Sequence, residues 1–259
     1  MRRTAAPVIA VALGAAVAAT LLSGGPARAT PPHFPVPVAL GDARQVITVL
    51  ADGTHATVTA WQGTAAGWVE LFSTGEARIG SHGTTDGATR HQGTGTTPTG
   101  TYTITRGFGI GQDPGTAMPY HQVTGDDWWV EDPQSPYYNQ MRTAAQGGFP
   151  LTEAGDRGSE HLVSYPTQYN NALVIDYNMN PAVPGRGAGI FLHDLGPQRG
   201  PTAGCVALPA TVMTEVLLWI DPSQHPVIAI GSATRADESD GNGPLSVGGS
   251  IVREQRNPT

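Results

Sequence analysis

Short runs of apolar and β-branched residues, separated by polar or glycine-rich turns, recur along most of the chain. Runs of this length predict β-strands, and the turn-like sequences Asp52-Gly53 and 63–67 separate the first three of them. A sequence built in this way indicates a single mainly-β domain. We expect strands at residues 46–50, 56–61, 68–72, 101–105, 172–177, 189–193 and 226–230.

One segment follows a different period and predicts a helix. Val212, Val216 and Ile220 recur at helical spacing, which places them on one face of a helix that packs into the core. Pro209 suits the first helical position, and Pro222 ends the helix. The region between the strands, residues 107–157, is rich in glycine, proline and aromatic residues, so we expect long packed loops that line a site.

The two ends of the chain read differently from the strand-rich part. Arg2 and Arg3 precede an uncharged apolar run at residues 5–22, and small residues up to Ala29 follow, which is typical of a cleaved secretory signal peptide. A retained membrane anchor is the alternative. We therefore expect a signal peptide at 1–29, a flexible segment at 30–41, the folded domain at 42–232 and a disordered tail at 233–259.

Charge argues against some partners. The chain has a formal charge of −7, and the 230 residues after the expected cleavage site carry 11 arginines, no lysine and 21 acidic residues. A chain with that excess of acid does not attract nucleic acid or an anionic membrane surface by its overall field. We expect an exported protein of the cell wall or extracellular space, with no nucleic-acid partner and no membrane contact once the signal peptide is removed.

Cys205 is the only cysteine of the 259 residues. A single cysteine cannot form a disulfide within its own chain. It pairs between chains, lies buried as a small apolar residue, or serves as a reactive thiol.

The neighbours of Cys205 favour the reactive thiol. His193 ends an expected strand twelve positions earlier, and the glycines and prolines of residues 194–201 let the chain double back. A thiol is mostly protonated at neutral pH, so a nucleophilic cysteine needs a base such as imidazole. Gly204 allows the backbone N–H groups of residues 204 and 205 to face a developing oxyanion, and we expect the positive end of the following helix to favour the thiolate. A structural histidine beside a buried cysteine is the alternative.

These residues resemble a known family. Residues 189–193 followed by 202–206, Gly-Ile-Phe-Leu-His and Thr-Ala-Gly-Cys-Val, are similar to the signature of the L,D-transpeptidase catalytic domain, also called YkuD-like. Residues 95–102 resemble the family's Thr-Pro-x-Gly-x-aromatic strand entry, and residues 77–80 its preceding strand. Weaker likeness at 137–139, 159–162 and 184–187 extends the resemblance over most of 55–231.

The sequence departs from the family pattern close to the cysteine. Ala203 stands where the family commonly has a second histidine, and Ala207 where it has arginine or asparagine. Asp194 replaces the glycine or serine that often follows the first histidine, and the loop from His193 to Cys205 is shorter than usual. The chain is therefore identified as a divergent member.

The resemblance implies a fold and a reaction. The fold is a β-sandwich or barrel with long loops and one helix after the cysteine. The reaction is acyl transfer on peptidoglycan stem peptides, in which Cys205 expels D-alanine from a tetrapeptide stem and forms a thioester. An amine of a second stem then attacks to give a 3→3 cross-link, with His193 as base and then acid. Acylation of the cysteine by carbapenems is a further family trait.

Three further residues are expected to support the site. Thr202 shapes the turn at the cysteine, and Asp194 orients the imidazole of His193 through its side chain or through a nearby backbone carbonyl. Because neighbouring residues on a strand point to opposite faces, the carbonyl is the better candidate. His161 is expected to supply the imidazole that Ala203 lacks, with a packing histidine as the alternative.

Three other functions compete with transpeptidation. Water in place of the acceptor amine gives an L,D-carboxypeptidase with the same residues. A zinc peptidase is disfavoured because the eight histidines form no H-E-x-x-H motif or metal-spaced cluster, so we expect no metal and no cofactor. A non-catalytic wall-binding module would use the aromatic residues near 128–138. The sequence does not fix the oligomeric state.

Overall fold

The computed structural model describes residues 33–232, so the expected signal peptide and the expected tail lie outside the described part of the chain. In this part of the chain the architecture is mainly β with one α-helix, as predicted. Within residues 33–232, no helix combines the length and the apolar character needed to span a membrane. The strands are β1 (Gln45–Asp52), β2 (His55–Thr64), β3 (Gly67–Arg78), β4 (Thr84–Asp86), β5 (Thr97–Gly109), β6 (Tyr120–Gln122), β7 (Asp127–Trp129), β8 (Met141–Thr143), β9 (Glu160–His161), β10 (Ala172–Ile175), β11 (Phe191–Asp194), β12 (Val206–Leu208) and β13 (Val227–Ser232), and the helix is α1 (Ala210–Trp219).

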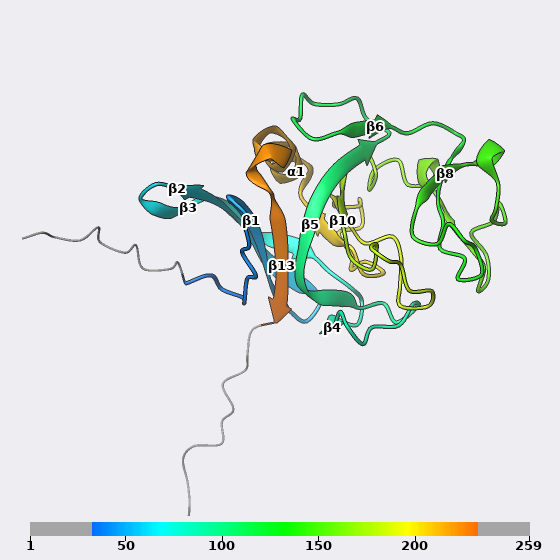
Figure 1. Ribbon diagram of the computed structural model, residues 1–259, viewed down its shortest axis with the longest axis horizontal. Helices are drawn as coiled ribbons and strands as arrows, with labels where there is room; N and C mark the ends of the chain where they lie inside the picture. The colour runs from blue at the N-terminus through cyan, green and yellow to red at the C-terminus, as the bar shows by residue number, and fades with distance from the viewer. Residues whose placement is uncertain (1–32, 233–259) are drawn as a thin grey trace, which may run out of the picture.

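Ten strands form one sheet that closes on itself. The order is β10-β11-β12-β3-β2-β1-β13-β5-β4, with β6 beside β5, and β10 also pairs with β5. This second pairing closes the strands from β10 round to β5 into a barrel. Figure 1 shows β1, β13 and β5 side by side at the centre of the molecule, and the β2–β3 hairpin extending away from them.

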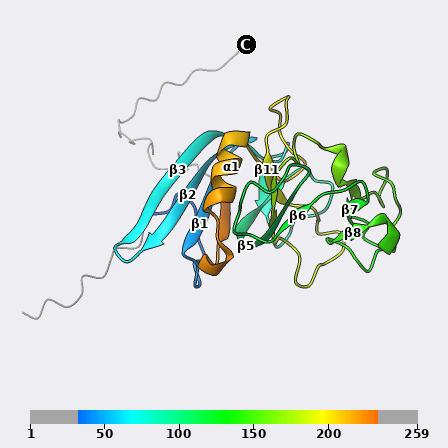
Figure 2. The same ribbon diagram turned by 90° about the horizontal axis from the view of Figure 1, so that it is seen from above.

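The inside of the barrel holds the main core. Leu192 of β11 and the alternate residues Val206 and Leu208 of β12 point inward, and Met213 and Val216 of α1 pack against them. Side chains at alternate positions of a strand point to opposite faces, so the apolar pattern decides which residues face this core. Figure 2 shows α1 lying along the barrel beside β1 and β2.

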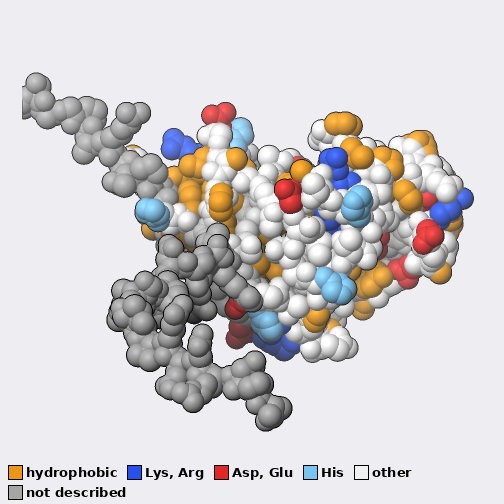
Figure 3. Space-filling view, turned by 90° about the horizontal axis from the view of Figure 1, so that it is seen from below, with side chains coloured by type: hydrophobic (Ala, Val, Ile, Leu, Met, Phe, Trp, Pro, Cys, Tyr) orange, Lys and Arg blue, Asp and Glu red, His pale blue; other side chains and the backbone are white. Residues whose placement is uncertain are grey.

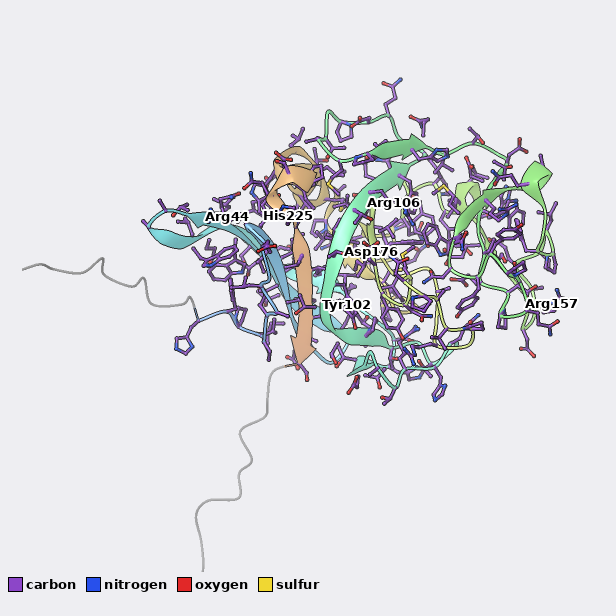
Figure 4. All side chains as sticks on the ribbon, viewed as in Figure 1. Arg44, Tyr102, Arg106, Arg157, Asp176 and His225 are labelled. Atoms are coloured by element: carbon purple, nitrogen blue, oxygen red, sulfur yellow. The ribbon has the colours of Figure 1, made fainter. Side chains whose placement is uncertain are left out.

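The outer face of β10 and β11 carries a second core. Phe191 and Ala172 point outward there, and they pack under Phe108 and Trp129. The cover is the loop-rich region, which extends beyond the expected 107–157 to include β9, so that it contains a small three-stranded sheet of order β8-β7-β9. Arg157 lies at the far edge of this region (Figure 4) and pairs with the buried carboxylate of Asp132 at 2.8 Å.

Two features differ from the expectations. The residues directly after Cys205 form strand β12, so α1 begins only at Ala210, with Pro209 as its N-cap. The segment 33–41, expected to be flexible, packs against the hairpin: the ring of Phe34 lies edge-on to Trp61 and Trp68, with centroids 5.4 Å apart in both pairs. Apolar aromatic contact orders this segment, which its prolines alone do not reveal.

Candidate active site

The parallel pairing of β11 with β12 brings the cysteine and the histidine to one face of the barrel. Leu192 lies opposite Val206, and His193 lies opposite Ala207. Cys205 comes directly before β12, so it lies beside Phe191, whose N–H donates to its sulfur at 3.4 Å. Since residues two apart on a strand share a face, the side chains of Cys205 and His193 lie on the same outward face.

The thiol of Cys205 is a hydrogen-bond donor in this structure. Its Sγ donates to the carbonyl oxygen of Gly189 at 3.2 Å. Within residues 33–232, no hydrogen bond joins this sulfur to the imidazole of His193, although the sequence predicts that the two come within reach of each other. Burial raises the pKa of the thiol well above its usual range, because only 8% of the residue is exposed and the carboxylate of Glu160 lies nearby.

His193 is held as a neutral base. Its Nδ1 lies 2.8 Å from the backbone carbonyl oxygen of Asp194. A carbonyl only accepts hydrogen bonds, so Nδ1 carries the proton and Nε2 keeps its lone pair. Burial lowers the pKa of His193 to about 4. The ring also lies edge-on to Tyr169, with centroids 5.5 Å apart.

The side chain of Asp194 does not contact the imidazole by hydrogen bond. Asn170 donates to its Oδ2 at 3.4 Å, and its Oδ1 has no partner within the described chain. Burial raises the pKa of this carboxyl to about 6. The carbonyl of Asp194 therefore contacts His193, as the alternation along the strand predicts.

Thr202 builds the turn that presents the cysteine. Its Oγ1 donates to the carbonyl oxygen of Cys205 at 2.7 Å and accepts from the N–H of Gly204 at 3.1 Å. The N–H of Gly204 is thus already engaged, which leaves that of Cys205 as the donor to consider for an oxyanion. Gly204 has a φ of +150°, and a Cβ there would lie 2.9 Å from both Arg90 Nη2 and the Thr96 oxygen, so only glycine fits.

A cavity of about 740 Å³ lies beside Cys205, whereas His193 is not among the residues that line it. Cys205, Gly204 and Gly189 line it on the barrel side, and the loop-rich region supplies the opposite wall. The cavity also has charged lining residues that the sequence analysis does not single out: Arg90, Glu131, Glu153, Asp156 and Glu160. Figure 3 shows acidic side chains on the end of the molecule away from the β2–β3 hairpin.

Two groups that the sequence analysis expects beside Cys205 lie elsewhere in the structure. His161 does not line the cavity: its ring stacks on Trp128 with centroids 4.3 Å apart, and its Nε2 lies 2.7 Å from the Gly125 oxygen. Its neighbour Glu160 lines the cavity instead, because adjacent strand residues point to opposite sides. The positive end of α1 does not adjoin Cys205, because β12 lies between them.

The aromatic residues of the loop-rich region mainly cover the second core. Trp129 is fully buried and donates through Nε1 to Asn139. Tyr138 is almost fully buried as well. This burial fits packing rather than an open sugar-binding surface. Within residues 33–232, no cluster of three or more His, Cys, Asp or Glu side chains is arranged to hold a metal ion.

Comparison with known proteins finds one matching protein family and a few similar solved structures. The family model of the L,D-transpeptidase catalytic domain (YkuD) matches residues 43–229. Among solved structures, Bd1075 from Bdellovibrio bacteriovorus is similar at 14% identity and a TM-score of 0.36, over 73% of this chain and 48% of that chain. The helical cell shape determining protein Pgp2 from Campylobacter jejuni is similar at 14% identity and a TM-score of 0.37, over 74% of this chain and 48% of that chain. The chain thus spans about half the length of these proteins. No curated protein matches its sequence.

Proposed function

The chain belongs to the L,D-transpeptidase catalytic domain family, and from this premise we propose that it is an exported enzyme that forms 3→3 cross-links in peptidoglycan. One observation carries the proposal: Cys205, the only cysteine of the sequence, lines a large cavity, and its side chain lies on the same face of the barrel as a neutral imidazole. A cysteine nucleophile and a histidine base are what acyl transfer through a thioester requires.

Acylation begins when Cys205 releases the Gly189 oxygen. Rotation about its Cα–Cβ bond turns the thiol toward Nε2 of His193, which takes the proton as the sulfur attacks the carbonyl of the third residue of a tetrapeptide stem. Such hydrogen bonds are often unformed without substrate and tighten in the bound complex. The proton then passes from His193 to the amine of D-alanine, which leaves, and a thioester remains.

The resting thiol is kept protonated until substrate arrives. Its pKa is raised by burial, while that of His193 lies at about 4. Transfer of the proton to imidazole is therefore unfavourable in the empty site. A polar substrate that stabilises both the imidazolium and the oxyanion, the latter at the N–H of Cys205, makes this transfer accessible.

The second half-reaction returns the enzyme to its starting state. The side-chain amine of the third residue of another stem attacks the thioester carbonyl and gives up a proton to His193. The carbon–sulfur bond breaks, and His193 passes that proton to the departing sulfur. Water in place of this amine yields a tripeptide, as in an L,D-carboxypeptidase. Both outcomes use the same acyl-enzyme.

Intact mass spectrometry after incubation with a carbapenem tests the nucleophile. We expect one covalent adduct on the wild type and none on Cys205→Ala. His193→Gln should slow adduct formation by about 10²- to 10⁴-fold, the usual loss when a general base is removed. The exposed His55→Gln is the matched control and should react like the wild type. An equal adduct on Cys205→Ala would sink the proposal.

The products from a defined tetrapeptide stem test the acceptor. Cross-linked dimers indicate transpeptidation, and we expect them to exceed the hydrolysed tripeptide at millimolar concentrations of acceptor. Tripeptide alone, with intact acylation, would mean that the enzyme is an L,D-carboxypeptidase.

A further inference from the structure

Arg90 lines the cavity beside Cys205, although only 5% of its surface is exposed. Within residues 33–232, no carboxylate oxygen lies within 4.0 Å of its guanidinium nitrogens. Glu131 lines the same cavity, but burial is the largest influence on its carboxyl and raises the pKa well above the usual range, which favours the neutral acid. Arg90 is therefore a buried cation without an ion pair, and such a group favours a bound anion.

Hydrogen bonds fix the guanidinium before any substrate binds. Its Nε donates to the backbone oxygen of Thr96 at 2.7 Å, and its Nη1 donates to that of Arg186 at 3.3 Å. The hydroxyl of Tyr177 donates to the same Arg186 oxygen at 3.0 Å, and a Cβ on Gly187 would collide with Nη1. These contacts come from three separate segments of the chain, so the guanidinium is preorganised.

The remaining nitrogen, Nη2, lies beside the turn that presents the cysteine. A Cβ built on Gly204 would lie 2.9 Å from it. With a carbon–carbon bond of about 1.5 Å, Nη2 is thus at most about 4.4 Å from the Cα of the residue before Cys205. Nη2 forms no hydrogen bond within residues 33–232, where the only fully buried side-chain nitrogen or oxygen without a partner is Oδ1 of Asp194. Nη2 therefore keeps some exposed surface, and a ligand in the cavity can reach it.

We infer that Arg90 is a catalytic residue of acylation, in which Nη2 and the N–H of Cys205 together hold the oxyanion that forms on the attacked carbonyl. The inference rests on the proposed function and assigns a further residue to it. The turn itself offers one backbone donor, because the N–H of Gly204 already donates to the Thr202 hydroxyl at 3.1 Å. Oxyanion stabilisation depends on convergent, preorganised donors, and the fixed guanidinium beside this turn supplies the second.

Arg90 stabilises charge without transferring a proton. When the sulfur of Cys205 attacks, its electron pair forms the carbon–sulfur bond and the π electrons of the carbonyl move onto oxygen. That pair re-forms the carbonyl as the carbon–nitrogen bond breaks, and the amine leaves with the proton held by His193. The guanidinium stays protonated throughout, since arginine does not lose its proton in proteins. Its field also reaches the nucleophile: burial, the largest influence, raises the pKa of the Cys205 thiol, whereas the charge of Arg90 acts in the opposite direction.

Two reactions at the same sulfur test the assignment. Acylation by a carbapenem passes through an oxyanion, whereas alkylation by iodoacetamide displaces iodide and forms none. Intact mass spectrometry gives both second-order rates at one pH for the wild type and for Arg90→Gln. The ratio of acylation to alkylation cancels changes in the ionisation or access of the thiol, because these affect both reactions. We expect Arg90→Gln to lower this ratio by about 10²- to 10³-fold, the usual loss when one oxyanion donor is removed.

Further variants separate the donor geometry of Arg90 from effects on folding. The exposed Arg44→Gln is the matched control and should keep the wild-type ratio. Arg90→Lys keeps the positive charge but loses the planar fork that reaches two carbonyls and the cavity at once, so its ratio should fall about tenfold. If circular dichroism shows that Arg90→Gln does not fold, Arg90→Lys decides. A wild-type ratio in a folded Arg90 variant, whether both rates fall together or neither falls, would overturn the inference.

The wild type distinguishes this inference from the proposed function. If iodoacetamide alkylates Cys205 but no carbapenem adduct forms, the proposed function fails, and the oxyanion assignment fails with it. If the wild type is acylated and the folded Arg90 variants keep its ratio, the cysteine enzyme stands and Arg90 is a structural residue of the cavity wall.

Discussion

The Cys205 thiol differs from an activated cysteine that rests as an ion pair with histidine. It is buried, donates to the Gly189 oxygen and has a raised pKa. We therefore predict that iodoacetamide alkylates it slowly at pH 7, and that the rate keeps rising above pH 9, beyond the range of an ordinary thiol with a pKa of about 8.5. Rates measured by intact mass between pH 5 and 10 check this. A rate that is already on a plateau at pH 6 would mean a preformed thiolate.

Thr202 links both sides of the nucleophile turn through one hydroxyl. Thr202→Val removes both hydrogen bonds at constant shape, and we expect a loss of about 1–2 kcal/mol in unfolding free energy together with slower acylation. Thr202→Ser should restore both. Thr214→Val removes a hydroxyl bonded to the Ala210 oxygen on the exposed face of α1, so it is the matched control. Urea unfolding and carbapenem acylation measure the two effects, and a Thr202→Val variant that acylates like the control would contradict this role.

Sequence reasoning at the residue scale finds groups that carry a local pattern. Cys205 and His193 stand in a recognisable spacing, and strand alternation correctly favours the carbonyl over the carboxylate of Asp194. Arg90 and Glu131 carry no such signal, because they line the cavity only through the packing of segments that lie far apart in the sequence. Glu160 lies next to His161, and only the direction of each side chain decides which one reaches the cavity.

At the scale of elements, Asn139 connects the loop-rich region to the barrel through hydrogen bonds. Its Oδ1 accepts from Trp129 Nε1 at 2.9 Å and from the N–H of Gly189 at 3.1 Å, and its Nδ2 donates to the oxygens of Tyr177 and Asn178. It is buried and has a φ of +60°. Asparagine tolerates this left-handed conformation better than most residues do.

Removing this side chain should loosen the cavity wall. We expect Asn139→Ala to lower the unfolding free energy by about 3 kcal/mol or more, because it leaves two buried N–H groups unsatisfied. Asn139→Gly keeps the backbone free of strain but loses the same bonds, so the difference between the two variants isolates the strain. Acylation should fall in both, since Gly189 positions the thiol. A stable, fully active Asn139→Gly would show that the hydrogen bonds are dispensable.

The strands and the helix were predictable where the pattern is long, and not where it is short. All seven expected strands exist, with shifted ends, and α1 lies between the two prolines that predict it. Strand β12 has only three residues and was missed, because its extended form comes from pairing with β11 rather than from propensity. The closing of the sheet by the β10–β5 pairing and the small sheet of β7–β9 are likewise tertiary effects.

At the scale of the whole molecule, the buried His193 and the half-buried Glu160 make opposite contributions to the dependence of stability on pH. The pKa of His193 is lowered from 6.5 to about 4, so the unfolded chain binds more protons between these values and stability rises with pH there. The pKa of Glu160 is raised from 4.5 to about 7, so the folded chain binds more protons and stability falls as pH rises through that window. The two slopes oppose each other, and Asp194 and Glu131, whose pKa values are also raised by burial, act in the same direction as Glu160.

A single substitution that removes one of these groups should therefore reveal how that group changes the unfolding free energy with pH. Relative to the wild type, we predict that Glu160→Gln gains stability as pH rises from 4.5 to 7, because it lacks the falling slope of Glu160. His193→Gln should lose stability relative to the wild type as pH rises from 4 to 6.5, because it lacks the rising slope of His193, and each difference should change by about 1–3 kcal/mol. Carboxylates with lowered pKa values, such as Asp127 and Asp132, act equally in all variants, so differences from the wild type remove their contribution. Urea unfolding at four pH values, with Glu215→Gln as control, measures the curves. If the two variants run parallel to the wild type, the groups titrate as they do in the unfolded chain. His193 would then not be a buried, neutral imidazole. The proposed resting state, a protonated Cys205 thiol with a neutral histidine base, would be wrong.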